Sequence, residues 1–184
     1  VIFLEHRWLH NTRGDVPLNP YRIPFGKAKS LQKGNDITII SMSYLNIEAL
    51  YAVDYLKSKD ISCDVIDVRT ISPMDWNFIF DSVKKTGRIL VLDSGFENGS
   101  VAGEIISEVS IKLFKYLKTP PSRLAMPNVP EPTSFGLTKD FYIRSKDIAK
   151  QCLEIMGEPN LNLDKDLPEN IPHDVPGSWF TGPF

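Results

Sequence analysis

Residues 61–103 read ISCDVIDVRTISPMDWNFIFDSVKKTGRILVLDSGFENGSVAG. This stretch predicts a strand, a helix, a second strand and a turn that opens a second helix. The run Cys63–Val68 is apolar except for two aspartates, as in a strand that is covered on both faces. Arg88–Leu92 has the same apolar character. Two strands joined by a helix form a crossover unit, which indicates a parallel sheet.

The helix between these strands has start and stop signals. Ser72 is the predicted N-cap, Pro73 suits the first helical position, and Asp75 places negative charge at the positive end of the helix dipole. Gly87 supplies a left-handed residue that ends the helix after Lys84 and Lys85. One buried face is predicted from apolar side chains at helical spacing: Trp76, Ile79, Phe80 and Val83.

The residues before this unit predict three further strands and a helix. Val1–Leu4 and Ile37–Met42 are apolar runs, and Ile23–Leu31 reads as an edge strand. Ser43 or Asn46 is the predicted cap of the next helix. Its buried stripe is predicted to be Ala49, Ala52, Val53 and Leu56.

The residues after the unit predict two helices and one more strand, the fifth of the sheet if Val1–Leu4 is not part of it. A helix should run from Ser100 to about Leu117, followed by a short strand at Ser122–Ala125 and a proline-rich loop over 126–138. Phe141–Ile143 should be extended, and Ser145 should cap the last helix. The longer helix should bury Ala102, Ile105, Ile106, Val109, Leu113 and Tyr116.

Two motifs in the central stretch carry a resemblance to a known family. VIDVRTISPMD (65–75) and SVKKTGR (82–88), with VIFLEHR (1–7), IPFGKAK (23–29) and the glycine-rich turn before Ser100, resemble the C-terminal domain of transketolase-like enzymes. The closest likeness is to the beta subunit of thiamine-diphosphate-dependent 2-oxo acid dehydrogenases of the pyruvate or branched-chain type. The likeness covers roughly residues 1–157.

This resemblance implies an α/β fold and a division of the chain. The fold should be a three-layer α/β/α sandwich on a five-stranded, mostly parallel sheet, with Ile23–Leu31 as an antiparallel edge strand. Residues 1–21 should be the end strand of an N-terminal domain, missing from this chain, plus a linker. Residues 22–157 should form the transketolase C-terminal-like domain. Residues 158–184 should be an acidic, proline-rich tail.

The three histidines are the first candidates for chemistry. His6 and His10 lie among other ionisable residues in the linker, where either could carry a proton at an active-site mouth. A solvated linker is the favoured interpretation, because connecting segments normally run over the surface. His173 stands alone in the tail, so the histidines do not make a metal site.

Two further candidates lie at the carboxyl ends of predicted strands. Asp67 and Arg69 sit where α/β folds often bind ligands, but a structural ion pair explains them equally well and is favoured. Gly95, Gly99 and Gly103 suggest an anion loop, yet their spacing fits neither known phosphate-binding fingerprint. A structural turn is favoured, with Gly103 allowing the helix to lie close on the sheet.

Composition restricts the remaining classes. The net charge of −2 gives no field for nucleic acid, and no apolar run approaches the length of a membrane helix. Cys63 and Cys152 fall in predicted core elements and are expected to be buried free thiols, in a cytoplasmic setting or in the mitochondrial matrix. Residues 158–184 hold five acids and one base. Both a flexible tail and a tail docked through Trp179, Phe180 and Phe184 are open, with docking slightly favoured.

The resemblance implies a function for the complete enzyme and a supporting part for this chain. The complete enzyme would decarboxylate a 2-oxo acid on thiamine diphosphate with Mg²⁺ and pass the acyl group to a lipoyl carrier. This chain would contribute subunit interface, with no catalytic, cofactor-binding or metal-binding residue of its own. Its partners would be its own N-terminal cofactor-binding domain, an alpha-type subunit, a second copy and a lipoyl acyltransferase core. Two alternatives stay open: a domain of transketolase or a related synthase, and a free-standing flavodoxin-like nucleotide-binding module.

Overall fold

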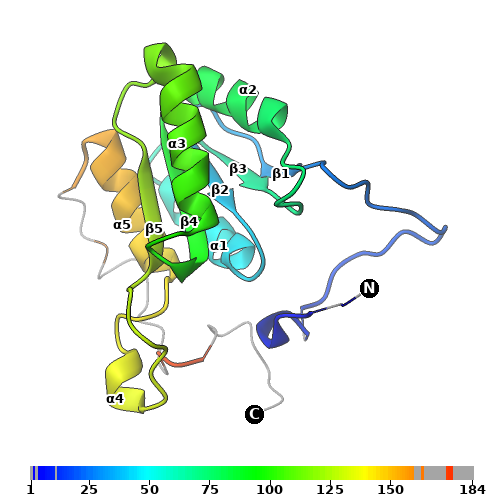
Figure 1. The fold of residues 1–184 in the computed structure, drawn as a ribbon. Helices are drawn as coiled ribbons and strands as arrows, with labels where there is room; N and C mark the ends of the chain where they lie inside the picture. Colours follow the sequence, from blue (N-terminus) through cyan, green and yellow to red (C-terminus); the bar gives the residue numbers. More distant parts are fainter. Residues whose placement is uncertain (1, 3, 11, 160–162, 164–172, 176–184) are drawn as a thin grey trace.

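A computed structural model of the chain describes residues 2, 4–10, 12–159, 163 and 173–175. Its centre is a five-stranded sheet with the strand order β1-β3-β2-β4-β5 (Figure 1). The strands are β1 (Lys29–Gln32), β2 (Ile37–Ser41), β3 (Cys63–Asp67), β4 (Ile89–Phe96) and β5 (Ser122–Met126). Four of them are parallel, and β1 pairs antiparallel with β3. The predicted sheet, with one antiparallel edge strand, is confirmed.

Helices cover both faces of the sheet (Figure 1). On one face α1 (Leu45–Lys57) and α5 (Ser145–Met156) pack against alternate residues of β2, β3 and β4. On the other face α2 (Trp76–Thr86) and α3 (Val101–Leu113) cover the intervening residues. Every residue of β2 is buried, as a central strand under two helical layers requires. The three-layer sandwich is therefore confirmed.

Three short elements complete the described chain. The 3₁₀ turns η1 (Arg7–Leu9) and η2 (Phe114–Tyr116) lie in the amino-terminal segment and after α3. The predicted loop over 126–138 contains a one-turn helix, α4 (Phe135–Thr138). Within the described part of the chain, no helix combines the length and the apolar character that crossing a bilayer requires.

The edge strand is shorter than predicted and carries an irregularity. The strand begins at Lys29. Residues 26–28 are not paired with β3, and Gly26 adopts a positive φ of 70° that a strand does not allow. The register with β3 shifts between Ser30 and Gln32, so the outer strand is bulged. The predicted strand Val1–Leu4 lies partly outside the described residues, and the two members described are not in a strand.

The starts of three helices differ from prediction, and the start of one agrees with it. Helix α2 begins at Trp76 and not beside Ser72. Tyr44, and neither Ser43 nor Asn46, stands at the N-cap of α1. At α5 the backbone N–H of Arg144 donates to the Asp147 carboxylate at 2.9 Å, so Ser145 is the first helical residue and not the cap. The side chain of Ser100 does cap α3, accepting from the Gly103 N–H at 3.3 Å.

Two other local predictions were wrong. Phe141–Ile143 is not a strand; Phe141 lies in a turn and still packs in the core on the α1 and α5 side. Tyr116 is half exposed, because α3 changes to the 3₁₀ turn η2 after Leu113 and the helical periodicity is lost. The predicted stripe of α1 is confirmed, with all four members buried.

The turn after β1 depends on a close approach between two backbones. A Cβ atom placed on the buried Gly34 would lie closer than 3.0 Å to the carbonyl groups of Ser62 and Cys63. The N–H groups of Asn35 and Asp36 donate to the Ser62 carbonyl at 3.1 and 2.9 Å. The absence of a side chain at Gly34 therefore sets the distance between this turn and the start of β3.

Both cysteines are free and buried, as predicted. A hydrogen bond with Cys63 and burial raise the pKa of the Cys152 thiol. We expect both thiols of the native chain to react with Ellman's reagent at least about tenfold more slowly than after unfolding in urea, because the reactive species is the thiolate. Rapid release of chromophore from the native chain would contradict this prediction.

Candidate functional site

The carboxyl end of β3 carries the first predicted candidate, the pair of Asp67 and Arg69. The Arg69 Nε lies 3.3 Å from the Asp67 Oδ2, and the Arg69 backbone N–H donates to the Oδ1 at the same distance. Arg69 adopts a positive φ of 57°. Both carboxylate oxygens therefore hold a local turn, which agrees with a structural ion pair.

The glycine-rich bend after β4 is held by a carboxylate of the chain itself. Asp93 is buried, and its two oxygens accept hydrogen bonds from the N–H groups of Gly95 at 2.8 Å and Ala102 at 2.9 Å. These amides, at the bend and in the first turn of α3, are the donors that an anion at a helix N-terminus would use. Asp93 already fills that position, so the geometry matches the predicted structural turn.

Replacing the Asp93 carboxylate should weaken this end of α3. The change Asp93→Asn keeps one acceptor but turns an amide group toward a backbone N–H, leaving a buried donor unsatisfied. We expect a loss of about 1–3 kcal/mol in the free energy of unfolding, measured by urea denaturation. The same change at the exposed Asp54 is the control and should stay within about 0.5 kcal/mol.

The reason for Gly103 differs from prediction. A Cβ there would meet the Nη1 of Arg123, at 3.3 Å, and no described backbone atom of the sheet. Arg123 extends from β5, and its Nη2 bonds Glu97 at 3.2 Å. The small residue therefore accommodates the Arg123 side chain and not a close helix–sheet approach. Gly99, in contrast, is needed for its positive φ of 71°.

Residues 69–75, the second half of the first family motif, bind the segment that precedes the edge strand. The Thr70 hydroxyl accepts from the Gly26 N–H at 3.2 Å, and the Asp75 carboxylate accepts from the Ala28 N–H at 3.2 Å. Pro73 fills the space above Gly26, 3.1 Å from where a Cβ would be. The Asp75 carboxylate thus bonds a segment 47 residues away and makes no cap hydrogen bond to α2, which begins at Trp76.

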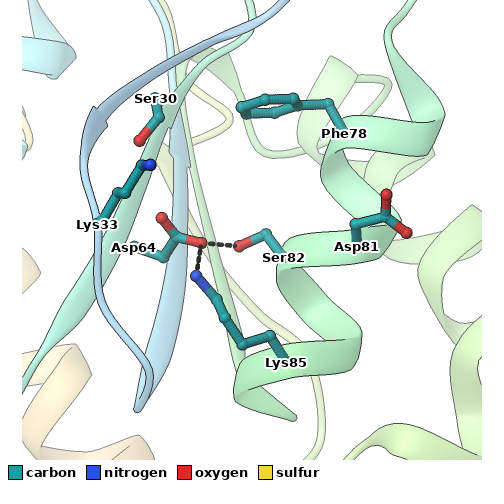
Figure 2. A pocket seen from close by; sticks show the side chains of 7 residues that line it. All are labelled: Ser30, Lys33, Asp64, Phe78, Asp81, Ser82 and Lys85. Carbon is teal, nitrogen blue, oxygen red and sulfur yellow. Dashed lines mark hydrogen bonds and ion pairs between the residues drawn. The ribbon is translucent and has the colours of Figure 1, made fainter.

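The second motif, over residues 82–88, is a polar network between α2 and the sheet. The Asp64 carboxylate of β3 accepts from the Ser82 hydroxyl at 2.6 Å and from the Lys85 Nζ at 2.5 Å (Figure 2). The Thr38 hydroxyl of β2 lies 2.8 Å from the hydroxyls of both Ser82 and Thr86. Each of these polar groups has a partner, so the network joins three elements without exposing a reactive group.

A hollow of about 360 Å³ lies beside this network, between the edge strand and α2 (Figure 2). Ser30 and Lys33 line one side and Phe78 lines the other. The acids in its wall are paired: Asp64 with Lys85, and Asp81 with Lys84 at 3.7 Å. Among the described residues that line the hollow, each carboxylate therefore lies beside a lysine ammonium group.

The linker histidines flank the amino-terminal turn η1, and the contacts described for them do not join them in a proton relay. The His6 Nδ1 accepts from the Trp8 N–H at 3.4 Å, and burial lowers the pKa of His6. His10 pairs with Glu5 at 3.0 Å. Trp8 packs edge-on against Tyr44 of the domain, with ring centroids 4.8 Å apart. The described linker residues are exposed, as predicted for a solvated segment, except that Trp8 and Leu9 are half-buried against the domain.

A buried charge pair that the sequence analysis did not identify lies under this turn. Arg144 and Glu48 are 8% and 1% exposed, with the Nη1 of Arg144 3.6 Å from the Oε1 of Glu48. The Oε2 of Glu48 accepts from the Ser145 N–H at 2.8 Å. The guanidinium lies 5.1 Å from the ring centre of Trp8 and 5.8 Å from that of Tyr142.

The tail histidine also has a place in the structure. The Nε2 of His173 lies 2.5 Å from the Phe135 carbonyl of α4, and the two rings are 4.0 Å apart. The Nη2 of Arg144 donates to the His173 carbonyl at 3.1 Å. The predicted docking residues Trp179, Phe180 and Phe184 lie outside the described residues.

A metal ion needs a cluster of ligands, and a diphosphate needs hydrogen-bond donors that the chain itself does not occupy. Among the residues that the structure describes, no three His, Cys, Asp or Glu side chains are grouped to hold a metal ion. At the start of α3 the Ala102 N–H bonds Asp93, whose charge would repel a diphosphate, and the Gly103 N–H bonds the Ser100 hydroxyl. These residues therefore do not fit thiamine diphosphate with Mg²⁺. Fold and site together define the class as an α/β domain in which the polar groups described above bond to one another.

The comparison with protein families names this domain. Residues 26–148 match the family model of the transketolase C-terminal domain, and the chain belongs to that family. This match covers both motifs and all five strands.

Curated relatives are beta subunits of larger enzymes. The chain is 36% identical over 163 residues to the acetoin:2,6-dichlorophenolindophenol oxidoreductase subunit beta of Bacillus subtilis, covering 88% of this chain and 47% of that protein. It is 40% identical over 139 residues to the pyruvate dehydrogenase E1 component subunit beta of Rickettsia bellii, covering 76% of this chain and 43% of that protein. The chain thus spans about half the length of the curated relatives it matches.

A solved structure supports the fold. A split-gene transketolase, described as an inactive beta4 tetramer, matches with a TM-score of 0.65 and 18% identity. The match covers 76% of this chain and 45% of that one. At this identity the likeness shows the shared architecture alone.

Proposed function

We propose that this chain is the C-terminal assembly part of a beta-type subunit in a thiamine-diphosphate-dependent 2-oxo acid dehydrogenase. It would contribute interface to an enzyme that decarboxylates a 2-oxo acid and transfers the acyl group to a lipoyl carrier. The family membership and the beta-subunit relatives support this proposal. Catalytic groups, thiamine diphosphate and Mg²⁺ would belong to other parts of the complete enzyme.

One observation carries the assembly role: apolar side chains stand exposed where the parallel strands end. Ile71 follows β3, Phe96 ends β4 and Val129 follows β5, and each is about half exposed. The carboxyl ends of parallel strands share one edge of a sheet, which is where α/β folds usually bind ligands. Here that edge offers apolar surface of the kind that is buried between subunits.

The chemistry of the same edge does not favour binding of a nucleotide or diphosphate. The carboxylate of Asp93 accepts hydrogen bonds from the amides of the bend, and Asp67 is paired with Arg69. A free-standing flavodoxin-like module would need those amides for an anion. The partners we propose are the cofactor-binding domain of a longer beta-type chain, an alpha-type subunit and a second copy of this domain, with a lipoyl acyltransferase core in the full complex.

Sedimentation equilibrium tests the interface with the second copy, which is the partner available to the chain alone. We expect reversible dimers, and we expect Phe96→Ser to lower the association constant at least about tenfold. The matched control is Phe114→Ser. Phe114 is also exposed, but it follows the C-terminal end of α3, whereas Phe96 precedes the N-terminal end of α3. Monomers at every concentration, or an equal effect of both changes, would contradict the proposed interface.

Calorimetric titration tests the absence of a cofactor site. Thiamine diphosphate with Mg²⁺, added to this chain alone, should give only heat of dilution. Saturable binding would show that the chain holds cofactor-binding groups, and turnover of a 2-oxo acid by the chain alone would overturn the assembly role.

A further inference from the structure

Arg144 joins two segments that lie far apart in the sequence. Its guanidinium lies beneath Trp8 of the amino-terminal turn, and its Nη2 donates to the carbonyls of His173 and Val175. We call residues 173–175 the strap. The turn and the strap therefore meet on one side chain that is 8% exposed.

Each segment also has its own contact with the domain. In the amino-terminal turn, Trp8 packs on Tyr44 and Tyr142, with ring centroids 4.8 and 5.4 Å apart. In the strap, the His173 ring packs on Phe135 and its Nε2 lies 2.5 Å from the Phe135 carbonyl. Arg144 contacts both segments.

The surroundings of Arg144 fit a clamp for carbonyl groups and not a site for a free anion. Its Nε and Nη1 have no hydrogen bond among the described residues. The carboxylate of Glu48 nevertheless lies 3.6 Å from the Nη1, and Glu131 bonds the neighbouring Tyr142 hydroxyl at 2.6 Å. The carboxylate of Glu48 already pairs with the cation, and neutral carbonyl oxygens can add to the guanidinium without bringing a second negative charge to it.

We propose that Arg144 couples the strap to the amino-terminal turn, so that release of either segment loosens the other. Trp8 keeps water away from the guanidinium, and hydrogen bonds in such a low-dielectric setting are stronger than in water. In turn, the carbonyls of His173 and Val175 hold the guanidinium against the Trp8 ring. A coupling of this kind is reciprocal, because each segment must change the affinity of the other by the same factor.

Limited proteolysis of the full chain can follow each segment at a single bond. Trypsin cuts after Arg7, within the turn, and endoproteinase Asp-N cuts before Asp174, within the strap. Mass spectrometry separates these products from cuts elsewhere. When opening is fast relative to cleavage, the initial rate at each bond reports the fraction of molecules in which that segment is open.

Two variants test the coupling from opposite sides. Trp8→Ala should raise the cutting rate before Asp174 at least about fivefold, although the ring contacts described for Trp8 lie outside the strap. Arg144→Lys keeps a cation beside Glu48 but cannot reach both strap carbonyls, so it should raise cutting at both bonds at least about tenfold. The control Arg123→Lys, on β5, should change neither rate.

The outcomes decide the proposal. An unchanged rate before Asp174 in Trp8→Ala would overturn it, as would loosening of only one segment in Arg144→Lys. Far-ultraviolet circular dichroism and the thermal midpoint identify a variant that fails to fold, and Trp8→Ala, which leaves the charge pair intact, then still decides the question. This inference does not depend on the proposed function, because it concerns contacts within one chain.

Discussion

Gly34→Ala is expected to destabilise the chain by about 3 kcal/mol or more, because the added methyl group would overlap main-chain atoms. The atoms concerned are the carbonyl groups of Ser62 and Cys63, which neither rotate away nor repack as a side chain would. Relief requires the turn after β1 to separate from the start of β3, which also stretches the hydrogen bonds from Asn35 and Asp36 to the Ser62 carbonyl. Urea denaturation should show a lower midpoint with an unchanged slope.

Two other glycines separate this overlap from simpler effects of the substitution. A methyl group on Gly14 would have no described heavy atom within 4 Å, and the φ of Gly14 is not positive, so Gly14→Ala should be nearly neutral. Gly99 also has open space but a φ of 71°, so Gly99→Ala should cost about 1–2 kcal/mol through backbone strain alone. A loss at Gly34 no larger than that at Gly99 would show that the two backbones can separate easily.

The second large effect is expected from Glu48→Met. The change leaves the guanidinium of Arg144 buried without its carboxylate and removes the acceptor for the Ser145 N–H. Breaking a buried ion pair from one side costs about 3–5 kcal/mol, because the remaining charge keeps its desolvation penalty. The free energy of unfolding from urea denaturation gives the measurement. The same substitution at the exposed Glu104 of α3 is the control and should stay within about 0.5 kcal/mol.

A double-mutant cycle shows whether the charge pair is the cause. With both Glu48→Met and Arg144→Met, no uncompensated charge remains from the pair, so the double variant should be more stable than Glu48→Met alone by about 1–2 kcal/mol. If the losses simply add, then packing of α1 on α5 and not the charge pair explains the effect.

The central crossover unit was predictable because its signals are local. An apolar run, an amphipathic helix and Gly87 at the helix end lie within one short stretch, and the structure places β3, α2 and β4 there. The start of α2 was not predictable in the same way. Ser72, Pro73 and Asp75 form a good local start signal, but Asp75 bonds the Ala28 N–H, and residue 28 is far away in the sequence. The local rule assigned the Asp75 carboxylate to the start of the helix, but in the structure it accepts a hydrogen bond from the distant Ala28 N–H.

The junction around Arg144 shows the limit for the site. Glu48 stands three residues after Leu45 and four before Ala52, on the buried stripe of α1, and Arg144 precedes the predicted cap of α5. The spacing of Glu48 therefore indicates burial, but charged side chains are rarely buried unless they are paired, and no local signal names Arg144 as the partner. Their pairing follows from α1 and α5 lying together on one face of the sheet. Which two helices lie side by side cannot be read from the periodicity or the motifs of either helix.

The bulged outer strand has a consequence for the chain at high concentration. Two molecules that met edge to edge at β1 would have to match a strand whose register shifts between Ser30 and Gln32, and this strand begins at Lys29 and is followed by Lys33. An irregular edge strand flanked by lysines resists pairing with the edge strand of a second molecule, and so resists growth of fibrils. Concentrated solutions should therefore stay free of thioflavin-positive polymer that grows from this side.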